Sequence, residues 1–235
     1  MESDARPLIL IDIDGVLAMY RGADCRIGAP IYRTGKDIPE ALHAVEALQI
    51  RAAVLTHRTR YEARCILGAL GLQTWSERLI SANDLFWQSL REVFWKGRLR
   101  GLSKAVAADI LTGRFGPYNA ECSVLIDDKL SNLIRMTEAG VVRFGILTPG
   151  IHCDASGKVH SFDLRLILTM AVALAQGKPV SCDTAGPCIF RFPAGSETLA
   201  ESELHTGQML SGSRLDVVSL LRTLKRVLAG ANPHS

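Results

Sequence analysis

Residues 8–17, LILIDIDGVL, constrain the fold most, because an apolar run leads two aspartates into a glycine turn. An apolar run of this length, bounded by a turn signal, predicts a buried strand. Side chains two positions apart on an extended chain point the same way, so we expect Asp12 and Asp14 to address one ligand. Two neighbouring carboxylates need a shared cation, proton or phosphoryl group, because like charges repel. The alternative is a buried strand that ends in an ordinary Asp-Gly turn.

Polar residues also follow two later apolar runs. Residues 52–56 predict a buried strand that ends at Thr56, and residues 123–127 predict one that ends in paired acids, Asp127 and Asp128. Between these runs, Lys104 begins a helix with apolar periodicity. Each of the two single residues has a plain alternative: Thr56 as a strand-terminal threonine, and Lys104 as a solvated lysine at a helix start.

Taken in order, these residues resemble the four motifs of the haloacid dehalogenase-like (HAD) superfamily, over roughly residues 7–148. Most members are magnesium-dependent phosphatases, so the resemblance implies a phosphoric monoester hydrolase. The dehalogenase branch usually lacks an acid at the position of Asp14, which therefore favours phosphoryl transfer.

The chemistry of the residue types agrees with this implication. A carboxylate can attack phosphorus and form an acyl phosphate, and Asp12, at the end of the strand, is the better nucleophile candidate. Asp14 can then serve as general acid and base. Thr56 and Lys104 would hold the phosphoryl oxygens and neutralise their charge in the transition state.

A magnesium ion takes oxygen ligands. The resemblance implies that Asp12, the backbone carbonyl of Asp14, and Asp128 bind it. Asp127 is expected to orient Lys104 or to support the metal indirectly, although two adjacent acids can exchange these roles. Asn132 matches a position at which many relatives carry a second acid.

The segment HRTR directly follows Thr56 and supplies candidate substrate-binding residues. Arg58 or Arg60 can grip a phosphate or carboxylate of the substrate through two parallel hydrogen bonds. We place His57 in the same candidate set. A solvated helix start is the alternative for this segment.

The order of patterns predicts an α/β fold: a Rossmann-like parallel sheet flanked by helices, with a C-terminal extension. In such sheets the ligand binds beyond the carboxyl ends of the strands, where the candidate residues fall. The expected strands are 8–12, 52–56, 78–80, 123–127 and 141–147, and the expected helices are 38–49, 60–70, 84–95, 103–112 and 130–139.

We expect a catalytic core over residues 1–150 and a C-terminal region over residues 151–235. That region carries predicted helices at 164–175 and 215–228 and a short strand at 189–192, and its role is open between completing the core, a lid and an oligomer interface. The polar segment after the first motif has the length of a hairpin flap, at residues 20–36. Because neither usual insertion point holds a cap-sized segment, we predict an open site.

Residues 83–101 mix aromatic and basic side chains, a combination that single-stranded nucleic-acid binders use for stacking and phosphate attraction. The helical spacing of Phe86, Leu90, Val93 and Phe94 instead favours a core face with a basic solvent side. We adopt the core-face interpretation.

Composition excludes little. The net charge of +3 gives no strong indication of a nucleic-acid or membrane partner, and no apolar run has the length of a membrane span. The apolar N-terminal run contains Asp12 and Asp14, which a secretory or membrane signal would not tolerate, so we expect a cytoplasmic protein. The six cysteines show no C-x-x-C spacing, so we expect reduced thiols, and Cys182, Cys188 and His205 fit no usual zinc pattern. The expected partner is a phosphorylated small molecule, with a nucleotide or polynucleotide end as an alternative and a homodimer as an option. The competing class is a catalytically silent binding or regulatory protein with the same fold.

Overall fold

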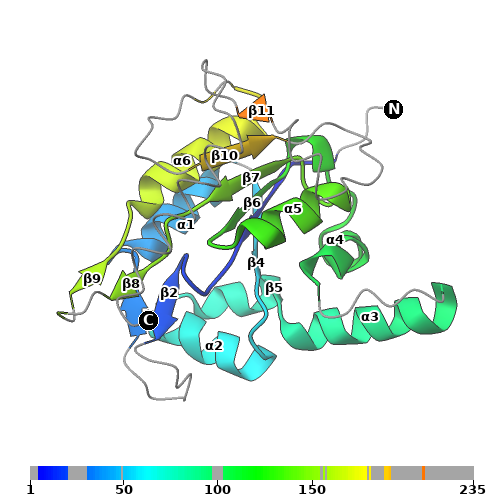
Figure 1. Ribbon diagram of the computed structural model, residues 1–235, viewed down its shortest axis with the longest axis horizontal. Coiled ribbons are helices and arrows are strands. Elements are labelled where there is room, and N and C mark those ends of the chain that lie inside the picture. The colour runs from blue at the N-terminus through cyan, green and yellow to red at the C-terminus, as the bar shows by residue number, and fades with distance from the viewer. Residues whose placement is uncertain are drawn as a thin grey trace, which may run out of the picture.

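A seven-stranded sheet forms the centre of the computed structural model, which describes residues 5–20, 31–48, 50–96, 103–153, 156, 158–178, 180, 188–191 and 208–209 (Figure 1). Five strands are parallel, in the order β7-β6-β1-β4-β5, and β10 and β11 extend the sheet antiparallel at the β7 edge. The predicted α/β class is therefore confirmed. The strands are β1 (Leu8–Ile11), β4 (Arg51–Leu55), β5 (Leu79–Ile80), β6 (Val124–Asp127), β7 (Phe144–Leu147), β10 (Cys188–Arg191) and β11 (Gln208–Met209).

The first strand, β1, lies in the middle of the sheet and is fully buried. Its Ile9 is opposite Ala52 of β4 on one side and Val124 of β6 on the other. The chain thus runs outward in both directions from β1, and such a switch in strand order opens a crevice at the carboxyl ends of the strands. The residues that follow β1 lie at that crevice.

Helices cover both faces of the sheet, and the side chains of β1 alternate between them. Ile9 and Ile11 pack in one apolar cluster, and Leu8 and Leu10 pack in the other. Helices α1 (Ile38–Ala47), α2 (Arg60–Ala69) and α6 (Leu164–Ala175) contribute to the first cluster, and α3 (Ala82–Lys96), α4 (Ala107–Phe115) and α5 (Leu130–Glu138) contribute to the second.

The C-terminal region contributes to the same core. The helix predicted at 164–175 is α6, and its Leu164, Ile167 and Leu168 are buried in the cluster that contains Ile9. The strand predicted at 189–192 is β10, which pairs with β7. Of the three roles considered for residues 151–235, completion of the core is the one that α6 fills. The helix predicted at 215–228 lies outside the described residues.

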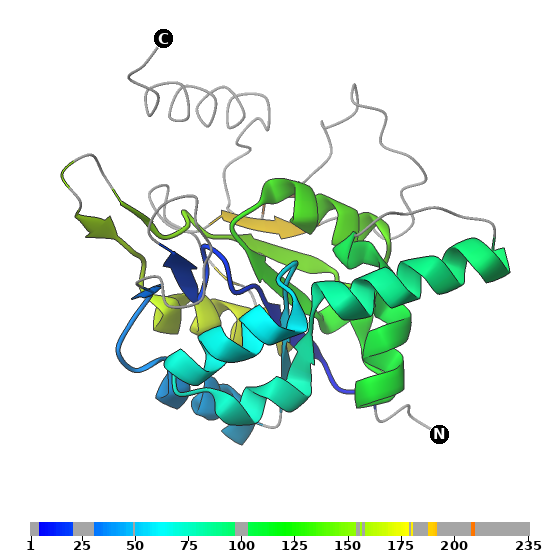
Figure 2. The ribbon, with the colours of Figure 1, turned by 90° about the horizontal axis from the view of Figure 1, so that it is seen from below.

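Two hairpins follow the ends of strands in the sheet. Strands β2 (Ala18–Tyr20) and β3 (Ile31–Arg33) pair antiparallel, as the expected flap requires, although its residues 21–30 lie outside the described part. Strands β8 (His152–Cys153) and β9 (Val159–His160) form the second hairpin, next to β2 in Figures 1 and 2. Between β4 and β6, the described residues form α2, α3, α4, β5 and three short 3-10 helices, η1 (Gln73–Arg78), η2 (Lys104–Val106) and η3 (Ala120–Cys122), so they include no cap domain.

Helix α3 overturns one prediction. Of the expected core face, Phe86 is 49% and Phe94 is 78% accessible, whereas Leu90 and Val93 are half-buried. The buried face is instead the opposite, mostly polar one, which holds Leu85, Gln88, Ser89 and Glu92. Gln88 donates a 2.8 Å hydrogen bond to Asp109 of α4, and Arg114 of α4 pairs with Asp84. Polar bonds to α4 thus orient the helix, and its large aromatic side chains are exposed.

The remaining element bounds differ from prediction only at their ends. The helix predicted at 103–112 begins as η2 and continues as α4 to Phe115. None of the described helices combines the length and the apolar character that a membrane crossing needs.

Candidate active site

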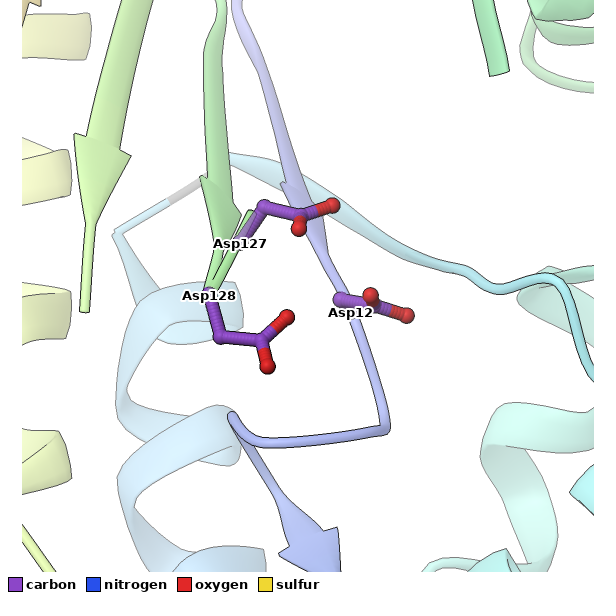
Figure 3. Close-up of side chains that lie close together, drawn as sticks. All are labelled: Asp12, Asp127 and Asp128. Carbon is purple, nitrogen blue, oxygen red and sulfur yellow. The ribbon is translucent and has the colours of Figure 1, made fainter. Parts of the chain in front are cut away.

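The sequence-predicted polar residues meet at the carboxyl edge of the sheet. Asp12 directly follows β1, Thr56 directly follows β4, and Asp127 is the last residue of β6, with Asp128 next. Because β1 pairs in parallel with both β4 and β6, these strand ends are adjacent. Figure 3 shows the carboxylates of Asp12, Asp127 and Asp128 gathered beside the end of β1. One oxygen from each of the three lies within 4.8 Å of the others.

Lys104 lies between two of these acids. Its Nζ is 2.7 Å from Asp12 Oδ2 and 2.6 Å from Asp127 Oδ2, and the side chain is 1% exposed. Ser103 positions the lysine, because its hydroxyl caps η2 by accepting a hydrogen bond from the backbone N–H of Ala105. The alternative of a solvated lysine at a helix start is therefore wrong.

The two adjacent aspartates have different surroundings. Asp127 accepts hydrogen bonds from Lys104, from the Asn132 side-chain amide at 2.9 and 3.0 Å, and from the backbone N–H of Lys129 at 2.8 Å. Asp128 has a buried oxygen, Oδ1, with no hydrogen-bond partner. A buried carboxylate oxygen without a partner is costly. Protein groups therefore engage Asp127, whereas Asp128 has an acceptor left for a bound cation.

The backbone of Gly15 lies directly against Asp128. A Cβ at position 15 would be 2.3 Å from Asp128 Oδ2, and the glycine has φ +75°, in the left-handed region. The Gly15 carbonyl also accepts a hydrogen bond from the N–H of Ile151 at 3.1 Å. Only glycine allows the turn after β1 to approach Asp128 this closely.

We expect Gly15→Ala to lower the free energy of unfolding by about 2–4 kcal/mol, because left-handed strain and a clash add together. The clash also displaces Asp128, so binding of the Mg²⁺ expected from the sequence should weaken, with a higher half-saturating concentration. Urea denaturation and calorimetric Mg²⁺ titration measure the two effects.

Gly140→Ala is the matched control. Gly140 has φ +67°, but a Cβ at position 140 would have no heavy atom within 4 Å, so only the strain remains. It should cost about 1 kcal/mol and leave Mg²⁺ binding unchanged. Equal losses in the two variants would contradict the close approach of Asp128.

Burial makes negative charge costly at this site. Burial raises the pKa of Asp12 to about 7 against the opposing effect of Lys104, and Asp127 adds to the rise. Burial and the neighbouring charge of Asp127 raise the pKa of Asp128 to about 6. For Lys104, burial alone would lower the pKa, but the charges of Asp12 and Asp127 outweigh it and raise the pKa. A divalent cation would relieve the repulsion among the acids, and a donor set of carboxylate oxygens suits Mg²⁺.

The Asp14 side chain is outside this cluster. The strand ends at Ile11, and residues 13–17 form a turn, so strand alternation does not carry the Asp14 carboxylate to the side of Asp12. The carboxylate instead accepts hydrogen bonds from Arg58, at 2.7 Å from Nη2 and at 2.9 and 3.0 Å from Nε. That Asp12 and Asp14 address one ligand stays a prediction, because Asp14 is still close enough for its charge to add to the raised pKa of Asp12.

The candidate substrate-binding residues have different surroundings in the structure. Thr56 is fully buried, and its hydroxyl accepts a hydrogen bond from the Arg58 N–H at 3.2 Å. His57 is exposed on the loop that follows. Arg60 forms an ion pair of 2.5 Å with Asp84 of α3. Its role in substrate binding stays a prediction.

Sequence reasoning missed Thr148. Its backbone N–H donates to the Asp127 carbonyl at 3.1 Å, and its buried hydroxyl has no hydrogen-bond partner. The residue follows β7 directly, so a polar residue after the fifth predicted strand was the available signal. Asn132 was noted as a replacement for an acid, and the structure shows its amide donating to Asp127.

Comparisons with known proteins match the fold only distantly. No family model and no curated protein matches the chain. A solved structure of a provisionally assigned HAD-like phosphatase from Mesorhizobium loti is 14% identical, with a TM-score of 0.46 over 74% of this chain and 88% of that one. A hypothetical protein from Pyrococcus horikoshii is 17% identical, with a TM-score of 0.25 over 71% of this chain and 68% of that one. At these scores neither likeness indicates a reaction, and the functional argument depends on the site itself.

Proposed function

We propose that this chain is a magnesium-dependent phosphatase of the HAD type, which hydrolyses phosphoric monoesters through an aspartyl-phosphate on Asp12. The observation that carries the proposal is the position of Asp12. It lies at the switch point of a parallel sheet, 2.7 Å from the buried ammonium of Lys104 and within 4.8 Å of oxygens of Asp127 and Asp128. The order of the motifs along the chain supports the same assignment.

In this proposal the chain's own residues divide the work. The Asp12 carboxylate attacks phosphorus, the bond to the leaving oxygen breaks, and water later releases phosphate from Asp12. Lys104 neutralises charge on the transferring group, since its ammonium already lies against the nucleophile. The buried Thr56 hydroxyl is the candidate donor to a phosphoryl oxygen. Asn132 and Lys129 hold Asp127, which in turn holds Lys104.

Asp12 and Asp128 are the residues that would hold Mg²⁺. The partnerless Oδ1 of Asp128 and the all-oxygen donor set fit a hard divalent cation. The backbone carbonyl of Asp14 joins them only through the family resemblance, and Asp127 has a supporting place. When bound, Mg²⁺ supplies charge neutralisation at the phosphate.

Asp14 remains our candidate general acid and base, but it can transfer a proton only when its carboxylate is released from Arg58. In the structure the two side chains form a bidentate ion pair. A substrate phosphate competes for the same guanidinium. We propose that substrate binding draws Arg58 from Asp14 to the phosphate, which frees the Asp14 carboxyl for proton transfer.

A generic aryl phosphate tests the proposed function. We expect hydrolysis that requires Mg²⁺, that stops after exhaustive chelation and that Ca²⁺ restores poorly. Calcium takes a larger and looser set of ligands than magnesium, so it positions phosphorus poorly for attack. Phosphate release, measured with each metal in turn, gives the result.

Full activity in excess chelator would reject the metal scheme. Mg²⁺ binding without hydrolysis of any phosphomonoester would instead favour the silent binding or regulatory protein. Within the proposal, a small phosphorylated molecule is the default substrate, and a cytoplasmic location and a homodimer remain predictions.

A further inference from the structure

The outward face of α3 is a feature of the described residues that the proposed phosphatase does not use. This face exposes four large aromatic side chains: Phe86 (49%), Trp87 (62%), Phe94 (78%) and Trp95 (85%). Trp87 and Phe94 are seven residues apart, two helical turns, so they share one face. Phe86 and Trp87 lie edge to face, with their ring centroids 5.6 Å apart. Exposed aromatic side chains grouped in this way mark a binding surface.

This surface begins at the rim of the candidate active site. The N–H of Ala82, the first residue of α3, donates to the Arg58 carbonyl at 2.8 Å, and Asn83 accepts a hydrogen bond from the Arg60 N–H at 2.8 Å. Arg58 in turn holds Asp14. From this start, α3 runs away from the sheet, and Figures 1 and 2 both show its far end projecting from the body of the protein.

Charge balances along α3 itself, with Asp84 and Glu92 against Arg91 and Lys96, and the sequence that follows it is positive. Residues 91–100 contain four cations, Arg91, Lys96, Arg98 and Arg100, and one acid, Glu92. This segment alone therefore has a net charge of +3, equal to that of the whole chain. A groove of about 510 Å³ lies between α3 and α4, a volume in the range of ligand pockets. Its lining includes Trp95, the cations Arg91 and Arg114, and the acids Glu92 and Asp109.

We propose that α3 binds a single-stranded polynucleotide and delivers its terminal phosphate to Asp12. Bases stack on Trp87, Phe94 and Trp95, and Arg91 faces the phosphate backbone. Stacking on exposed aromatic rings beside cations is how proteins bind single strands without sequence preference. The rise of about 10 Å from Trp87 to Phe94 spans about three nucleotides at the spacing of a stacked strand. This inference depends on the proposed function, because it names the substrate class of the same site.

Oligonucleotides with a terminal phosphate, as DNA and as RNA, are the probes. We expect the intact protein to have a higher kcat/KM for them than for the matching mononucleotide. The double variant Trp87→Ala/Trp95→Ala should lower that kcat/KM by about 10-fold or more, because each stacked base contributes substantially to affinity. Its hydrolysis of an aryl phosphate should be unchanged. Leu166→Ala, which removes an exposed apolar side chain from α6, is the control and should change neither.

Tryptophan fluorescence provides a readout that is independent of catalysis. The chain has three tryptophans, and Trp75 is buried, so stacked bases should quench the signal of Trp87 and Trp95. The quenching should weaken with added salt and should be retained in the catalytically inactive Asp12→Asn protein.

The outcomes separate the two proposals. Aryl phosphate hydrolysis without oligonucleotide preference or quenching would overturn the α3 inference and leave the phosphatase intact. Quenching without any hydrolysis would overturn the phosphatase and retain the binding surface. A dimer in light scattering that Phe94→Asp dissociates, with no quenching by either nucleic acid, would assign the surface to a second copy of the chain. A preference between the DNA and RNA probes decides which polymer is bound.

Discussion

Replacing Asp12 with asparagine should reduce phosphate release by about 10³-fold or more, because an amide cannot form the acyl phosphate. The variant keeps the shape of the side chain, and Lys104 keeps its 2.6 Å contact with Asp127, so the fold should survive. Steady-state hydrolysis of an aryl phosphate measures the loss. Mass spectrometry after acid quenching should show a phosphoryl group on the wild-type protein and none on the variant.

Asp163→Asn is the matched control for this prediction. Asp163 caps α6 at the surface, with its carboxylate accepting from the Arg165 N–H at 2.9 Å, so the change alters a carboxylate that does not belong to the acid cluster. It should leave turnover unchanged. An Asp12→Asn protein within tenfold of wild-type activity, with an intact circular dichroism spectrum, would assign the nucleophile to another residue.

Replacing Lys104 with methionine should both abolish turnover and lower the free energy of unfolding by about 3–5 kcal/mol. Methionine fills much of the space of the lysine but leaves Asp12 and Asp127 facing one another without the buried cation that separates them. When one member of a buried charge cluster is removed, the remaining buried charges lose their compensating partner, and this destabilises the fold. Urea denaturation in chelator measures the stability, and phosphate release measures the activity.

Two further variants separate charge from packing in this result. Adding Asp127→Asn to Lys104→Met removes a negative charge together with the positive one, so it should recover part of the lost stability while turnover remains absent. Lys178→Met changes an exposed lysine and should shift stability by less than about 0.5 kcal/mol. No recovery in the double variant would show that packing, not charge, carries the loss.

Much of the site could be predicted because its residues follow the ends of buried strands. Asp12, Thr56 and Asp127 each lie at the end of an apolar run that the sequence shows clearly, and parallel pairing places such ends at one edge. Lys104 has no such signal of its own. Its place beside Asp12 depends on how η2 packs, and before folding it reads equally well as a solvated lysine.

The direction of a helix face could not be predicted in the same way. The spacing of Phe86, Leu90 and Phe94 defines an apolar stripe on α3, but spacing alone does not say what covers that stripe. The bonds from Gln88 to Asp109 and from Asp84 to Arg114 turn the polar side inward. The pairing of Arg60 with Asp84 likewise depends on partners 24 residues apart along the chain.

The sequence by itself therefore determined the α/β class, the polar residues that follow each buried strand and the acids available for a metal. Strand periodicity and turn residues are local properties of the chain, so they can be recognised before the fold is known. The tertiary structure decided which of those side chains meet. It paired Asp14 with Arg58, placed Asp127 against Lys104 and Asn132, and left Asp128 with a free acceptor. These assignments depend on contacts between distant segments, which only the folded chain brings together.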